Sequence, residues 1–89
     1  MTRQAETTSW AEYKAKVEPV WMEWAAKDRA IGAELRAKGK EANARYSDEQ
    51  ERRRAIRTAR EEADIKWRAA WNEAEAKDRE AWKKYRQAL

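Results

Sequence analysis

The sequence contains no cysteine and no histidine, and it has only two glycines, one proline and two serines. Without cysteine there is no disulfide, thiolate metal site, iron–sulfur cluster or cysteine nucleophile. Without histidine the chain lacks the commonest general base and metal ligand, and the Glu-x-x-His motif of helical di-iron sites cannot occur. Neither serine lies in a G-x-S-x-G motif, and no glycine-rich phosphate loop is present. We therefore expect a protein that is not an enzyme and has no metal, cofactor or small-molecule substrate.

Long apolar runs are missing too, because the longest stretch without a charged residue covers only residues 7–11. That is too short for a membrane span or for the core of a signal peptide. The net charge of +4, from 21 basic and 17 acidic residues, gives a surface of mixed sign with a basic bias. We expect a cytoplasmic protein without membrane contact, and the charge permits a nucleic-acid partner without requiring one.

The residues that are present favour helices. Charged residues make up 43% of the chain, nineteen residues are alanine and six are tryptophan, and no alternating pattern typical of strands occurs. Ser9–Glu12 and Ser47–Gln50 have the S-x-x-E/Q form of a capping box, and Gly39 between them is a typical helix stop. The sequence thus predicts an all-α fold, with helices over about residues 9–38 and 48–87. Residues 9–89 are expected to form a single helical domain after a disordered tail at residues 1–8.

Two features leave the number of helices open. Pro19 lies inside the first predicted helix, where it must kink the helix or divide it. Residues 40–46 can form a loop or continue the first helix past Gly39. In either case the short connection predicts a long antiparallel helical hairpin, with two helices, or three if Pro19 breaks the first.

Large and small side chains both recur at intervals of eleven residues, which is close to three helical turns. The large series are Trp10 with Trp21, Tyr13 with Trp24 and Leu35, and Trp71 with Trp82. A small series is Ala59, Ala70 and Ala81. These stripes predict straight helices that approach closely at the alanines, with indoles beside them. Residues 21–29 also match residues 71–79 at six of nine positions, which suggests a weak internal repeat.

The hairpin geometry predicts an uncovered end. With the turn near residues 42–45, Trp21 and Trp24 should face Ile65 and Trp67. The end of the longer second helix should extend past the first, unless residues 1–8 fold back over it. This end carries the candidate partner-binding residues Trp82, Tyr85 and Leu89. An exposed aromatic patch marks self-association or a partner site, and a lone two-helix hairpin buries little surface. We therefore expect dimerisation into a helical bundle.

Asp28 and Asp78 fall within the tryptophan stripes, so each carboxylate is expected to be paired. The candidate partners are Arg57 or Arg60 for Asp28, and Lys14 or the Trp10 indole N–H for Asp78. Such buried polar pairs fix the register between similar helices. A contact to a partner protein and an acid–base function are the alternatives.

Five arginines lie within nine residues at the start of the second helix: Arg52, Arg53, Arg54, Arg57 and Arg60. They are a candidate surface for nucleic-acid phosphates. The alternative is a solvated helix face with ion pairs from Glu49 to Arg53 and from Arg57 to Glu61. Neighbouring acidic residues dilute the positive charge, and no recognition-helix motif is present.

The function that the sequence favours is a small binding module, an adaptor or inhibitor, which contacts another protein through a helix face as a homodimer. A nucleic-acid-binding accessory protein that uses the arginines is the first alternative. A self-assembling structural protein is the second.

Overall fold

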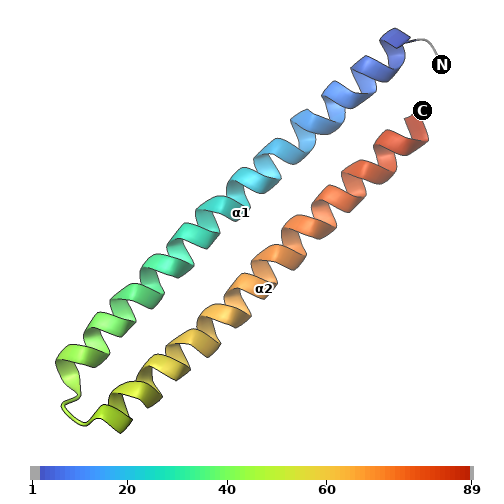
Figure 1. Cartoon of the computed structure of the whole chain (residues 1–89). Helices are drawn as coiled ribbons and strands as arrows, with labels where there is room; N and C mark the ends of the chain where they lie inside the picture. The colour runs from blue at the N-terminus through green and yellow to red at the C-terminus, as the bar shows by residue number, and fades with distance from the viewer. Residues whose placement is uncertain (1–2, 89) are drawn as a thin grey trace. The chain divides into compact units, whose positions relative to one another are not determined.

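The described part of the chain is all-helical and consists of two helices joined by a short turn (Figure 1). The computed structural model describes the backbone of residues 3–88 and the side chains of residues 9–88. Helix α1 spans Arg3–Arg45 and helix α2 spans Glu49–Ala88. The predicted all-α antiparallel hairpin is confirmed, and it has two helices rather than three.

The chain divides into two compact units. We call Met1–Ala25 with Trp71–Leu89 the terminal unit, and Ala26–Ala70 the turn unit. Each helix contributes one segment to each unit. In the terminal unit, Trp10 contacts Tyr85 and Trp21 contacts Trp71, so the two segments run antiparallel. In the turn unit, ion pairs from Glu34 and Lys38 to the second helix show the same antiparallel order.

Helix α1 begins at Arg3, although the sequence favoured a start at residue 9 after a disordered tail. Residues 3–8 contain neither glycine nor proline, so nothing in them ends a helix that continues from residue 9. Ser9 lies inside the helix, and the prediction that it caps the helix was wrong. The first two residues of the expected tail lie outside the described residues.

Pro19 does not divide α1, which continues through it as one helix. Proline has no N–H, so the carbonyl group of Ala15 loses its partner inside the helix. Both Pro19 and Ala15 are exposed, and water can therefore satisfy that carbonyl group.

Gly39 does not end α1 either, because the helix continues to Arg45. A helix that ends at a glycine usually places it at a positive φ, and among the described residues no glycine has one. Ala42, in the added segment, is only 4% exposed, so packing offsets the unfavourable helix propensity of Gly39. The turn therefore lies at residues 46–48 instead of 42–45, and α2 is capped by Asp48 rather than by Ser47. The Asp48 carboxylate accepts the Gln50 N–H at 3.0 Å.

We expect Gly39→Ala to raise the free energy of unfolding by about 0.5–1 kcal/mol, because alanine restricts the unfolded chain and favours helix. A Cβ at position 39 would meet no atom within 4 Å, so the substitution introduces no clash. Urea unfolding followed by circular dichroism measures the gain. The reverse change at an exposed helical position of the same segment, Ala44→Gly, should give a loss of similar size. A destabilised Gly39→Ala protein would contradict a helical Gly39.

The buried residues are nearly all alanine. Among the described residues, those less than 9% exposed are Ile31, Ala42, Ala59, Ala63, Ala70, Ala74 and Ala81. Five of these alanines lie on α2 at alternating intervals of four and seven residues, which places them in one stripe along the helix. We call this stripe the alanine seam. Side chains this small let the helix backbones approach closely, as the eleven-residue spacing predicted.

The later turn changes which residues face each other. Trp21 and Trp24 contact Trp71, not Ile65 and Trp67 as expected, which is a shift of four to six residues. Ile65 is instead 67% exposed. The prediction of that layer was wrong because it depended on a turn placed too early in the chain.

Candidate binding surface

Seven aromatic side chains of the terminal unit form two clusters. The outer cluster is Trp10, Tyr13, Trp82 and Tyr85, and the inner cluster is Trp21, Trp24 and Trp71. Neighbouring rings in both clusters have centroids 5.2–6.0 Å apart, and each of these pairs is tilted or edge to face. On each helix the spacing of these residues places them on one side of the helix. We call the two clusters together the aromatic face.

Asp78 joins the two clusters. Its carboxylate accepts the Tyr13 hydroxyl at 2.5 Å and the Trp21 indole N–H at 2.8 Å. Tyr13 belongs to the outer cluster and Trp21 to the inner one, and both lie on α1 while Asp78 lies on α2. The Asp78 carboxylate therefore links the two helices as well as the two clusters.

The Asp78 carboxylate also changes the chemistry of Tyr13. Its hydrogen bond, together with partial burial and its negative charge, raises the pKa of Tyr13 from 10.0 to about 12. Ionised Tyr13 would place a phenolate beside a carboxylate and would lose the donated proton. The hydroxyl therefore stays protonated, and the link between the clusters stays intact, well above neutral pH.

Three indoles of the aromatic face remain open to solvent. Trp10 and Trp71 are each 45% exposed, and Trp82 is 41% exposed. The other aromatic residues of the face are half-buried and support these three from below and beside. Exposed indoles held in place by ring contacts are typical of protein-binding hot spots.

The candidate residues Trp82 and Tyr85 both belong to the aromatic face, but they do not extend past α1. Trp82 contacts Tyr13, and Tyr85 contacts Trp10 and Tyr13. The expected overhang is absent there because the turn lies later in the chain than predicted, which brings Trp82 and Tyr85 opposite Tyr13 and Trp10. Leu89, the third candidate, lies outside the described residues.

The two aspartates, Asp28 and Asp78, differ in their hydrogen-bond partners, and in the described part of the chain neither has the partners that the sequence predicted. Asp78 is paired, and one partner is an indole N–H as predicted, but the partners are Tyr13 and Trp21 rather than Lys14 or Trp10. Asp28 is half-buried in the turn unit. Among the described residues, no hydrogen bond or ion pair joins it to Arg57 or Arg60, so the expected pairing of Asp28 is not seen there.

The candidate arginines all lie in the first turns of the α2 segment of the turn unit. Arg53 pairs with Glu49 at 2.7 Å, as the i,i+4 spacing predicted. The predicted pair between Arg57 and Glu61 is not formed among the described residues. Arg54, Arg57 and Arg60 are exposed, Arg52 is half-buried, and none of these four has an ion pair within the described residues.

The two units differ in charge. By sequence, the turn unit has 13 basic and 9 acidic residues, and the terminal unit has eight of each. The whole net charge of +4 therefore belongs to the turn unit. Seven of the nine aromatic residues belong to the terminal unit. The two binding surfaces considered from the sequence, aromatic and basic, thus lie in different units.

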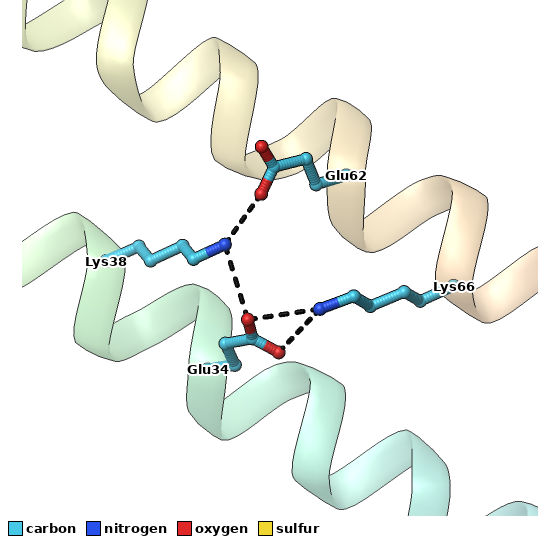
Figure 2. Close-up of polar contacts among 4 residues, drawn as sticks. All are labelled: Glu34, Lys38, Glu62 and Lys66. Atoms are coloured by element: carbon cyan, nitrogen blue, oxygen red, sulfur yellow. Dashed lines mark hydrogen bonds and ion pairs between the residues drawn. The ribbon is translucent and has the colours of Figure 1, made fainter.

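The turn unit also contains a charged network that the sequence did not single out (Figure 2). The Lys38 amine contacts Glu62 at 2.6 Å and Glu34 at 3.3 Å, and the Lys66 amine contacts both oxygens of Glu34. Hydrogen bonds from Lys66 and then Lys38 lower the pKa of Glu34, and a hydrogen bond to Glu62 raises the pKa of Lys38. These groups are exposed, so water and salt screen them and the network adds little stability.

Within the described residues, no group of three or more carboxylates is placed to hold a metal ion. In the same part of the chain, neither helix contains a segment apolar enough to cross a membrane. The chain matches no protein-family model, no curated protein and no solved structure. Its function must therefore be inferred from its surfaces.

The sequence did not identify Tyr13 and Trp21 as the partners of Asp78, or Trp10 and Trp71 as exposed members of a surface. The eleven-residue series did group Trp10 with Trp21 and Trp71 with Trp82. Which of these series meet across the hairpin depends on the position of the turn, and the sequence predicted a turn too near the N-terminus.

Proposed function

We propose that the chain is a small non-enzymatic binding module, an adaptor or inhibitor, which acts in the cytoplasm and contacts another protein through its aromatic face. The observation that supports this most is the exposure of Trp10, Trp71 and Trp82 at 41–45% on one supported surface. Large exposed apolar side chains that gather on one part of a small protein mark an interaction site. Trp82 and Tyr85 are the residues that we expect to contribute most, and Leu89 extends the candidate site by sequence.

A second candidate function is nucleic-acid binding through the arginines of the turn unit. Two observations favour it: the whole net charge lies in that unit, and four of the five arginines have no ion pair among the described residues. Cations without internal partners are free to contact phosphates. The third candidate is a self-assembling structural protein.

One experiment separates the first two candidates. The immobilised chain is incubated with lysate of its source and with a labelled DNA duplex, at low and high salt, beside two variants. The first variant carries Trp82→Ala and Tyr85→Ala, and the second carries Arg54→Gln, Arg57→Gln and Arg60→Gln. Contacts through the aromatic face should survive high salt and be lost in the first variant.

Binding through phosphates should weaken steeply with salt, and the arginine variant should reduce the slope of log affinity against log salt by about one per arginine lost. Each variant serves as the control for the other, because each changes one candidate surface and leaves the other candidate surface intact. If neither variant changes any captured partner or the duplex affinity, both site assignments are wrong.

A further inference from the structure

We infer that the partner which occupies the aromatic face is a second copy of this chain, packed face to face in a symmetric dimer. This inference rests on the proposed function, because it takes the aromatic face as a protein-binding surface and names the protein that covers it when the chain is alone in solution; another partner protein would have to displace the second copy. Three observations carry it: the small size of the buried side chains, the exposed area of the chain, and the neutrality of the terminal unit.

The two helices bury too little apolar surface against each other to account for the stability of the hairpin. Of the seven residues under 9% exposed, six are alanines, and no described side chain is less than 2% exposed. Each alanine removes only one methyl group from water, worth roughly 0.8 kcal/mol per buried carbon. The largest apolar side chains of the terminal unit are its indoles, and three of them, Trp10, Trp71 and Trp82, remain 41–45% exposed. A second aromatic face is the surface that would bury them.

The exposed area leaves room for a large interface. The chain exposes 7156 Å² at a mass of 10.6 kDa, whereas a folded monomer of this mass exposes about 5,500 Å². The excess of about 1,700 Å² is more than the roughly 800 Å² that each partner buries in a standard interface. It falls in the range that subunits of permanent dimers bury.

The charge distribution favours self-association of the terminal unit over binding to a charged partner. Its eight basic and eight acidic residues cancel, so two copies can approach without net repulsion. In a two-fold symmetric contact, the same patch meets itself. The exposed indoles come from both helices, Trp10 from α1 and Trp71 and Trp82 from α2, so both helices of each copy take part.

The test compares lysine substitutions inside and outside the aromatic face by light scattering behind a sizing column. Trp82→Lys and Trp71→Lys place a charge on the face. Met22→Lys and Ile65→Lys are the controls, because these residues are 68% and 67% exposed and belong to no aromatic cluster. All four changes replace an apolar side chain with the same cation, and circular dichroism checks that each variant stays helical.

We expect the wild type to have about twice the mass of 10.6 kDa at low and at high salt. Each substitution occurs twice in a symmetric dimer, so Trp82→Lys should raise the dissociation constant at least about 100-fold. The two controls should change it by less than about threefold. If Trp82→Lys unfolds, Trp71→Lys tests the interface in its place. The concentration dependence of wild-type tryptophan emission then gives the dissociation constant of the dimer independently.

A wild type that stays monomeric across a wide dilution series overturns the dimer. Equal weakening by all four substitutions, or weakening by the controls alone, overturns the aromatic face as its interface. Neither result refutes the proposed function by itself. That function fails only if Trp82→Ala with Tyr85→Ala leaves every captured protein in place, which is a separate measurement.

Discussion

Ala74→Leu should lower the free energy of unfolding by about 1–3 kcal/mol, although leucine is nearly as good a helix former as alanine. Ala74 is 4% exposed and lies in the alanine seam, where the helices of the terminal unit meet closely. Three extra carbons at that position must push α1 away or displace neighbouring rings. Because the chain is small, a loss of this size is a large part of its total stability.

The matched control is Ala69→Leu, which introduces the same side chain at an exposed position of the same helix. It should change the free energy of unfolding by less than about 0.5 kcal/mol. Urea unfolding of both variants must be compared at one fixed protein concentration, because a dimer links stability to concentration. A seam in which Ala74→Leu is no more harmful than Ala69→Leu is not closely packed.

The sequence predicted this seam correctly for a physical reason. Spacing along a helix is a local property, so the eleven-residue alanine series placed Ala59, Ala70 and Ala81 on one stripe before any contact was known. All three are buried. The same local logic predicted the two helices, since alanine and charged residues favour a helix at every position. It also predicted the ion pair between Glu49 and Arg53.

Register could not be predicted in the same way. A glycine inside a helix costs only about 1 kcal/mol relative to alanine, and the burial of Ala42 offsets that cost. Gly39 therefore looked like a helix stop but is not one, and every pairing across the hairpin shifted with the turn. This is why an indole N–H was the right kind of partner for Asp78, while Trp10 was the wrong residue.

Exposure could not be predicted from periodicity either. The spacing placed Trp71 and Trp82 in one series on α2 beside the alanines, and both contact rings of α1, yet both remain more than 40% exposed. Two helices that meet at alanines leave no room between them for indoles, so the rings lie beside the seam. A third layer would bury them, and residues 3–88 do not contain one. The candidate binding surface exists because alanines hold the two helices close together while the indoles beside them are too large to fit between the helices.

Asp78→Ala should lower the free energy of unfolding by about 2 kcal/mol. It removes the acceptor of two hydrogen bonds and leaves the Tyr13 hydroxyl and the Trp21 N–H without a partner in a half-buried site. Glu80→Ala, which removes an exposed carboxylate two residues away on the same helix, should have little effect. If both variants unfold at the same urea concentration, the Asp78 carboxylate does not link the helices.

The pH dependence tests the same contact independently. The pKa of Tyr13 is about 12 in the folded chain, whereas a tyrosine in the unfolded chain has the ordinary value of 10.0. Folding therefore favours the protonated phenol. The resulting stability is fully present below pH 10 and is lost as the pH rises toward 12.

Asp78→Asn removes the negative charge, so the pKa of Tyr13 should fall toward 10. The ultraviolet absorbance of the phenolate measures this change. Tyr13→Phe should remove this part of the alkaline loss of stability. A Tyr13 that titrates identically in wild type and Asp78→Asn would mean that the carboxylate does not hold the hydroxyl, and the two aromatic clusters would then be independent.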